Sequence, residues 1–542
     1  MLDPIRVNSR HSWVKFLLPL VAFAFLGFAS DRTNIVLIVV DDMGYGDLGC
    51  YGSEIPTPNI DSLAENGIRF RQFYNTAKCW TTRASLLTGL HYQQATTQKM
   101  LNGKGVTIAE LLGERGYKTI LSGKWHLSGG KFDDRSNQPL AHGFDEFFGT
   151  LHGAGSFYDP FTLRSGHEAI EPSEDFYYTD AVADHAVDSL KAVASEGRPF
   201  FHYVAFTAPH WPMQAPAEEI EKYKRLYRKG WDKVREERFA RQVRLGVADE
   251  HWGVGPRNPG VPSWEDAEHR EWEIHRMATY AAMLNIVDRG VGRIVEQLKS
   301  QNALDNTLIL FMSDNGGSHE EIGFKNGVSC LGGSQTSRRG THIQVGKDPS
   351  VMPGPEETFQ GVGPGWANVN NTPFRMHKIW SHEGGIATPL VAHWPDGIKR
   401  KGTITNEVGH VIDVMATCLE VTGESYPSEF QGRPILPNEG QSLVPAFIGE
   451  SIDDRVLYWD YAFKAAVRDG KWKLLAPTTK KLKWELYDME TDRGELNNLA
   501  NTYPEKVREM AVMYDKWMEH IGANPAKQVT MPQSERVASA DR

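Results

Sequence analysis

The sequence predicts an α/β fold in which a largely parallel sheet is covered by helices on both faces. Four continuous apolar runs carry this prediction, at residues 34–40, 117–122, 200–206 and 307–312. Runs of this kind, separated by segments of helical periodicity, are typical of central strands that are buried on both faces. After about residue 450 the pattern changes to short strands followed by one helix, which predicts a small antiparallel sheet at the C-terminal end.

Three segments have the helical periodicity that the covering layers need, namely 57–70, 105–116 and 276–300. Residues 318–370 are rich in Gly, Ser and Pro. This composition predicts long irregular insertions on the active-site side of the sheet, because Gly and Pro interrupt regular structure.

Residues 222–244 are strongly basic, with aromatic residues interleaved, a composition that could bind a polyanionic polysaccharide. However, Tyr223, Tyr227, Trp231 and Val234 recur at helical spacing. This spacing favours an amphipathic helix that packs its aromatic stripe against the protein.

The N-terminus carries a basic stretch followed by an apolar run over residues 16–29, which predicts a secretory signal peptide of residues 1–29. The run is short for a membrane span, so export to the periplasm or the outside is preferred over a retained anchor. The expected organisation is then a main domain over 30–450, a small α+β domain over 451–525 and a disordered tail over 526–542.

The chain has 542 residues and a formal net charge of −10. A protein of this charge does not hold nucleic acid by its overall field, and a polyanionic substrate requires a locally positive cleft. The four cysteines, Cys50, Cys79, Cys330 and Cys418, follow no metal-ligand spacing and do not form the pattern of a disulfide framework.

Each of the four apolar runs ends in a polar cluster, and these clusters contain Asp41, Asp42, Lys124, His126, His210, Asp314 and Asn315. In open α/β sheets, ligands bind beyond the carboxyl ends of the strands, so we expect the clusters to converge on one site. The carboxylate and amide oxygens are the donors that Ca²⁺ or Mg²⁺ prefers. A lysine and two histidines beside such a cation suit the hydrolysis of an oxyanion ester, which needs neutralising charge and a proton donor.

Cys79 precedes a helical stretch over residues 81–90, which we expect to be capped by Thr81 or Thr82. The positive end of this helix and the nearby Arg83 would both lower the pKa of the thiol. The local pattern leaves four possibilities open: a buried apolar side chain, a redox thiol, a nucleophile, or the precursor of a modified residue.

Several motifs in order narrow these possibilities, among them "NIVLIVVDDMGYGDLGCYG", "CWTTRASLLTG", "SGKWHLSGG", "TAPHWPMQ", "LFMSDNGG" and "NTPFRMHKIWSHEGG". The chain resembles a type I sulfatase of the alkaline phosphatase superfamily over nearly all of its mature length. The resemblance implies an alkaline-phosphatase-like α/β/α sandwich with a large mixed sheet. It also implies hydrolysis of sulfate esters of the arylsulfatase type. Export and the long insertion over 318–370 favour a sulfated carbohydrate as the natural substrate.

The resemblance also implies a modified nucleophile and a metal site. Cys79 would be oxidised after translation to formylglycine (3-oxoalanine), whose hydrate attacks sulfur. One Ca²⁺ would be held by Asp41, Asp42, Asp314, Asn315 and the modified residue 79.

The remaining roles carry over in the same way. Arg83 would hold the hydrate, while Lys124 and Lys378 would grip the sulfate group. His210 would protonate the leaving alcohol, and His126 would help the sulfated diol return to the aldehyde.

One position departs from the family pattern. The modification segment has the form C-x-P-x-R, and this chain has Thr81 in place of the proline. Threonine favours an extended backbone more weakly than proline does, so conversion by a formylglycine-generating maturation enzyme would be slower or would need a specialised enzyme. Two alternatives stay open: a phosphate or phosphonate monoester hydrolase of the same superfamily, and a non-catalytic sulfoglycan-binding protein in which Cys79 stays a thiol.

Overall fold

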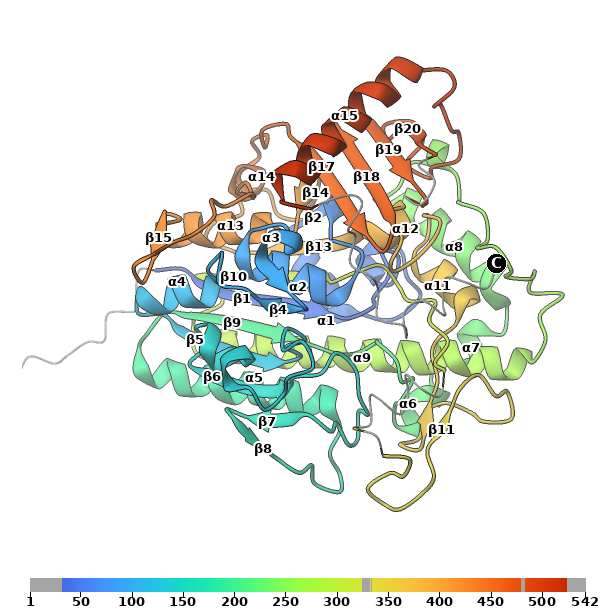
Figure 1. The fold of residues 1–542 in the computed structure, drawn as a ribbon. Coiled ribbons are helices and arrows are strands. Elements are labelled where there is room, and N and C mark those ends of the chain that lie inside the picture. Colours follow the sequence, from blue (N-terminus) through green and yellow to red (C-terminus); the bar gives the residue numbers. More distant parts are fainter. Residues whose placement is uncertain (1–31, 324–331, 333, 479–482, 524–542) are drawn as a thin grey trace, which may run out of the picture.

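A ten-stranded mixed sheet forms the centre of the molecule, with the strand order β14-β2-β13-β10-β1-β9-β5-β6-β7-β8 (Figure 1). The computed structural model describes residues 32–323, 332, 334–478 and 483–523. The predicted signal peptide, the predicted C-terminal tail and Cys330 lie outside these residues.

The four strands that the apolar runs predict are adjacent and parallel. They are β1 (Asn34–Val40), β5 (Lys118–Gly123), β9 (Phe200–Ala205) and β10 (Thr307–Ser313). β1 lies between β10 and β9, and β5 lies on the other side of β9. The prediction of a parallel centre is therefore confirmed, and the carboxyl ends of these strands open on one edge.

The other strands make the sheet mixed. They are β2 (Ile68–Tyr74), β6 (Glu146–Thr150), β7 (Leu163–Ser165), β8 (Glu168–Ala169), β13 (Ala387–His393) and β14 (Thr403–His410). β13 runs antiparallel to both β10 and β2.

The expected helix over 57–70 is wrong in its second half, because α1 (Pro58–Glu65) ends before Gly67 and β2 follows. A side chain at Gly67 would meet the Ala392 carbonyl at 2.1 Å, so this turn requires glycine.

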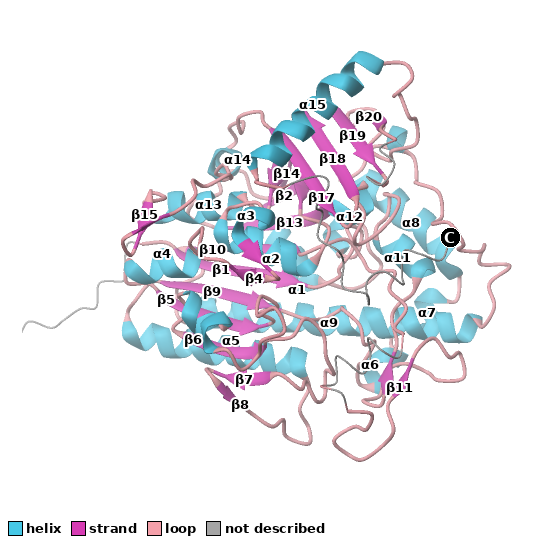
Figure 2. Cartoon of the chain, viewed as in Figure 1, coloured by secondary structure: helices cyan, strands magenta, loops and turns pink. Residues whose placement is uncertain are grey.

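Alternate residues of β1 enter the two faces of the sandwich. Leu37 packs with α2 (Cys79–Thr88), α4 (Ile108–Glu114) and α13 (Asp413–Thr422) in one core. Ile38 packs with the opposite layer, which contains α1, α5 (Tyr178–Glu196) and α9 (Arg270–Ser300). Figure 2 shows helices on both sides of the central strands. Burial on both faces explains why these strands are apolar throughout.

The basic segment over 222–244 forms two helices rather than one. α7 (Lys224–Tyr227) and α8 (Gly230–Leu245) meet at Gly230, which has a φ of 77°. The aromatic stripe is buried as predicted. Arg238 is fully buried and pairs with Asp47 and Glu54, so it serves packing rather than a polysaccharide.

The C-terminal region forms an antiparallel four-stranded sheet, as predicted. Its strands are β17 (Val456–Tyr461), β18 (Lys464–Asp469), β19 (Trp472–Ala476) and β20 (Glu485–Asp488). The helix α15 (Pro504–His520) packs on one face, at the top of Figure 1. The other face joins the core of the main sheet through Leu457 and Trp459.

Shorter elements complete the described chain. They are η1 (Gly49–Tyr51), α3 (Tyr92–Ala95), β3 (Thr96–Thr97), β4 (Met100–Leu101), η2 (Arg135–Asn137), η3 (Pro139–His142), α6 (Ala217–Glu221), η4 (Glu250–Trp252), β11 (Gln344–Val345), β12 (Thr358–Phe359), α11 (Pro364–Asn370), α12 (Glu383–Ile386), β15 (Glu429–Phe430), β16 (Arg433–Pro434) and α14 (Val444–Ile448). Within the described residues, every helix is too short or too polar to cross a membrane.

Candidate active site

The polar clusters at the ends of the four central strands meet at the carboxyl edge of the sheet. Lys124, which follows β5, forms a buried ion pair with Asp41, which follows β1. Asn315, after β10, donates through Nδ2 to Asp42 Oδ1 at 2.7 Å. His210, beyond β9, has Nε2 at 3.5 Å from Asp42 Oδ2. The parallel centre of the sheet therefore brings these residues together.

Arg83 joins the helix α2 to this cluster. Its Nε and Nη2 donate to Asp314 Oδ2 at 3.0 and 2.8 Å, and its Nη1 donates to the Lys124 carbonyl at 3.2 Å. Nη1 also donates to the hydroxyl of Tyr203, at 3.1 Å, a partner that the sequence did not predict. The guanidinium is fully buried, and its Nη2 also lies 3.9 Å from Asp41 Oδ2, so protein contacts alone orient it.

The helix α2 begins earlier than predicted, at Cys79, after an extended Lys78. Thr81 and Thr82 are not caps, because they lie in the first turn. The Thr81 hydroxyl donates to the Lys78 carbonyl at 2.7 Å and accepts from the Thr76 hydroxyl at 2.6 Å. Thr82 Oγ1 accepts from the Thr76 amide at 3.0 Å. These hydroxyls fasten the first turn to the segment before it.

Cys79 is buried, with 1% of its surface exposed. The prediction that its thiol has a lowered pKa is wrong. Burial raises the pKa of the Cys79 thiol, and the nearby charge of Lys124 does not offset this effect. A protonated thiol is a poor nucleophile, so the site does not suit an unmodified cysteine as the reacting group. Cys50 and Cys418 are also free and buried.

The carboxyl groups of the cluster differ in their electrostatics. Burial alone would raise the pKa of Asp41, but the charges of Lys124, His210, Arg83 and Lys378 outweigh burial and hold this pKa below its usual value. Burial and the neighbouring charge of Asp41 raise the pKa of Asp314 to about 7. Two carboxyl groups so close together need a positive partner between them to stay ionised.

The donor set fits a hard divalent cation. Asp41 Oδ1, Asp314 Oδ1 and Asn315 Oδ1 are all buried and have no hydrogen-bond partner within the described residues. Buried oxygens without a donor call for an explanation, and an oxygen-bound cation such as Ca²⁺ provides one. One oxygen each from Asp41 and Asp42 and one ring nitrogen of His210 also lie within 4.8 Å of one another.

Lys378 lies on the loop before α12 and reaches the same cluster. Its Nζ is 2.8 Å from Asp42 Oδ1 and 3.0 Å from Glu320 Oε2. Burial would lower the pKa of Lys378, but these two carboxylates keep it well above its usual value. Glu320 was not predicted, because it lies in an irregular stretch whose composition gives no sign of what it faces.

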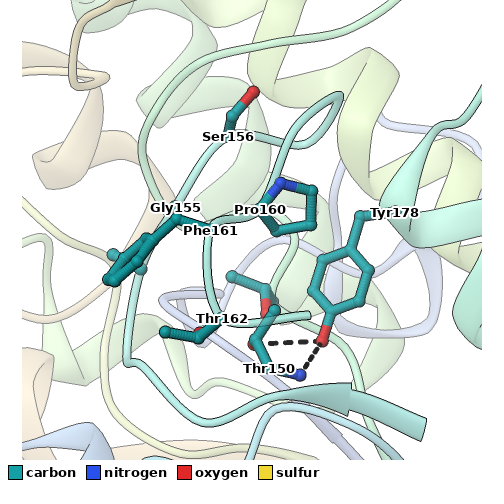
Figure 3. A pocket seen from close by; sticks show the side chains of 9 residues that line it. Thr150, Gly155, Ser156, Pro160, Phe161, Thr162 and Tyr178 are labelled. Atoms are coloured by element: carbon teal, nitrogen blue, oxygen red, sulfur yellow. Dashed lines mark hydrogen bonds between the residues drawn. The ribbon is translucent and has the colours of Figure 1, made fainter. Parts of the chain in front are cut away.

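His126 lies beside this cluster but makes no hydrogen bond to it within the described chain. Burial, reinforced by the charge of Lys124, lowers the pKa of His126 well below its usual value and keeps the ring neutral. Gly153 packs directly on the ring, since a side chain there would lie 2.2 Å from His126 Nε2. Residues 154–156, which follow Gly153, line a small cavity of about 10 Å³. Beside it, the Tyr178 hydroxyl accepts from the Thr150 amide and donates to the Thr150 hydroxyl (Figure 3).

The comparisons with known families agree with this site. A family model described as "Sulfatase" matches residues 33–424, and one described as "N-sulphoglucosamine sulphohydrolase, C-terminal" matches residues 375–521. An uncharacterized sulfatase of Schizosaccharomyces pombe is 32% identical, with 89% of this chain and 92% of the relative covered. An arylsulfatase of Klebsiella aerogenes is 33% identical, with 76% and 91% covered.

Solved structures share the fold. A protein solved in complex with k-i-k-neocarrahexaose has a TM-score of 0.64 and 24% identity, with 94% of this chain and 98% of that chain covered. A protein solved with its substrate D-glucosamine-2-N,6-O-disulfate has a TM-score of 0.61 and 21% identity, with 91% and 98% covered. Fold, site and sequence relatives thus define a sulfuric ester hydrolase with an alkaline-phosphatase-like sandwich. The chain belongs to the sulfatase family, among the type I sulfatases.

Proposed function

We propose that this protein hydrolyses sulfate esters of sulfated carbohydrates, with aryl sulfates as accepted artificial substrates. The nucleophile is the hydrate of a formylglycine made from Cys79, and one Ca²⁺ assists. The observation that carries the proposal is the surroundings of Cys79. Lys124, Lys378 and Asp41 all act electrostatically on this buried side chain. Asp41 also belongs to the group of carboxylate and amide oxygens that suits a cation.

The residues of the chain divide the chemistry between them. Once oxidised and hydrated, residue 79 supplies one hydroxyl that attacks sulfur and a second whose deprotonation releases sulfate. Asp41, Asp42, Asp314 and Asn315 would hold Ca²⁺, which polarises the sulfate oxygens. Arg83 is fixed by Asp314 and Tyr203, so its charge is aimed before substrate binds. Lys124 and Lys378 offset the charge of the ester.

The two histidines suit opposite proton transfers. His210 Nδ1 lies 2.6 Å from the Trp211 carbonyl, which can only accept, so Nδ1 carries a proton and Nε2 faces Asp42. Burial lowers the pKa of His210, and the charge of Asp42 opposes this effect, so Asp42 favours the protonated ring that gives its proton to the leaving alcohol. His126 is held neutral by burial and can accept the proton from the second hydroxyl of the hydrate.

The proposal extends to maturation, domains and location. Residues 1–29 are removed on export to the periplasm or the outside, and a formylglycine-generating enzyme converts Cys79 despite Thr81. Residues 30–450 carry the catalytic domain, and residues 451–525 form the smaller C-terminal domain.

Rates on two nitrophenyl esters test the reaction class. We expect kcat/KM for the sulfate to exceed that for the phosphate by about a hundredfold or more, because one proposed cation with Lys124 and Lys378 supplies less positive charge than a two-metal phosphatase site. Near-equal rates would favour the phosphate monoester alternative. Release of inorganic sulfate from sulfated oligosaccharides then identifies the natural substrate class.

Replacement of Asp314 tests the metal site. Asp314→Asn keeps the shape but removes one ligand charge, so we expect calcium affinity to fall by about ten- to a hundredfold. Calorimetric titration of the folded protein with Ca²⁺ measures this directly, without reliance on activity. Asp305→Asn is the matched control. Asp305 is exposed and precedes the first residue of β10, whereas Asp314 follows the last residue of this strand. Unchanged affinity in Asp314→Asn would remove Asp314 from the ligand set.

A further inference from the structure

Glu320 is a carboxylate at the active site that the proposed chemistry does not use. Its Oε2 accepts from Lys378 Nζ at 3.0 Å and from Trp211 Nε1 at 2.8 Å. Its Oε1 accepts from Lys78 Nζ at 3.3 Å. The Ser318 hydroxyl also donates to Oε2, at 3.3 Å. A carboxylate has about four acceptor sites, so these contacts leave little capacity to bind a substrate group directly.

The partners of Glu320 tie together three segments that carry the proposed reacting groups. Lys78 directly precedes Cys79, and Trp211 directly follows His210. Lys378 is itself a proposed sulfate ligand, and it is fully buried. Hydrogen bonds to an ionised carboxylate are stronger than those between neutral groups, so this one carboxylate links all three segments.

Glu320 also sets the charge balance of the pocket. Around residue 79, the described cationic groups are Lys78, Arg83, Lys124 and Lys378, and the carboxylates are Asp41, Asp42, Asp314 and Glu320. Three of these carboxylates belong to the proposed metal site. Glu320 does not, because, among the described residues, it lies outside the group of ligand atoms within 4.8 Å of one another and has no buried oxygen without a partner. It is therefore the carboxylate whose charge can change while the proposed cation ligands stay intact.

A sulfate monoester carries one negative charge, whereas a phosphate monoester carries nearly two at neutral pH. We propose that Glu320 is a positioning residue that sets the preference of this pocket for a singly charged ester over a doubly charged one, acting through Lys378 and Lys78. The inference rests on the proposed sulfatase function and names what enforces its selectivity. Removal of the Glu320 charge leaves one more unit of positive charge beside the ester, which favours the dianion more than the monoanion.

The variant Glu320→Gln tests this directly. It keeps the size of the side chain and an oxygen for the Trp211 indole but removes the charge. We expect the ratio of kcat/KM for nitrophenyl phosphate to that for nitrophenyl sulfate to rise about tenfold over the wild-type ratio. The ratio is independent of the fraction of active enzyme, so partial misfolding or incomplete conversion of Cys79 does not change it. An unchanged or lower ratio would overturn the proposal.

Two further variants sharpen the test. Glu321→Gln is the matched control, because Glu321 is exposed and pairs with Lys347 at 2.8 Å; its ratio should equal that of the wild type. Lys78→Met removes a positive charge from the same group and should lower the ratio, which keeps the proposal testable if Glu320→Gln does not fold. An inactive wild-type enzyme on sulfate would instead contradict the proposed function, so the two failures are distinct.

Discussion

Replacement of Cys79 by alanine is expected to lower kcat on nitrophenyl sulfate by about 10⁴-fold or more, because it removes the reacting group. Peptide mass spectrometry of the wild-type protein should show residue 79 lighter by about 18 Da than a cysteine, as expected for conversion to the aldehyde. The substitution is small and lies at the first position of α2, so the fold should survive. Thermal unfolding of the variant checks this.

The control for this experiment is Cys50→Ala. Cys50 is also a free, buried cysteine, but it lies in η1, beside Asp61 rather than beside the cation and lysine groups. We expect its activity to stay close to that of the wild type. Full activity in Cys79→Ala would end the nucleophile assignment. An unmodified thiol at residue 79 in active protein from its native host would contradict the formylglycine step alone.

The second large effect is expected on stability, from Lys473→Met in the C-terminal sheet. Lys473 is fully buried on β19, and its Nζ lies 2.8 Å from both Glu383 and Glu495. Removal of the cation takes the lysine partner from two buried carboxyl groups, of which Glu383 keeps Arg493 at 2.9 Å, and loss of one partner of a buried pair costs about 3–5 kcal/mol. We expect this loss in the free energy of unfolding from denaturant titration.

Lys471→Met provides the comparison. Lys471 lies two residues away and pairs with Asp488 at 2.9 Å, but its side chain is 43% exposed. An exposed pair of this kind contributes little, so we expect a much smaller change in the free energy of unfolding than in Lys473→Met. Equal effects in the two variants would show that the buried ion pairs of Lys473 with Glu383 and Glu495 do not stabilise the fold. Because Glu383 begins the helix that follows the Lys378 loop, we also expect lower activity in Lys473→Met.

The central strands and the residues that follow them could be predicted because a strand buried on both faces must be apolar throughout. Residues 34–40 match β1 to the residue, and Asp41 follows at the sheet edge. The antiparallel direction of β13 could not be predicted, since hydrophobic pattern carries no strand direction. The raised pKa of the Cys79 thiol was also missed, because it follows from burial and from the charges of Lys124 and Asp41, which come from distant parts of the chain.

Glu320 shows the same limit at the site itself. Its neighbours in sequence are polar and irregular, and its role depends on Lys78 and Trp211, which lie more than a hundred positions away.

The start of α2 was predicted two residues too late for a more local reason. Thr81 and Thr82 are common capping residues, but they lie in the first turn of α2, and their hydroxyls bond to Thr76 and Lys78 in the segment before the helix.

The near-complete enclosure of Cys79 sets a sequence of events for the cell. Only 1% of this side chain is exposed, and its segment is fastened by the Thr76, Thr81 and Thr82 hydroxyls, so no second enzyme can reach it once the chain has folded. If residue 79 is converted as proposed, its oxidation must therefore come first and folding second. A host that folds this protein ahead of its maturation partner would accumulate well-folded molecules that later exposure to that partner cannot activate.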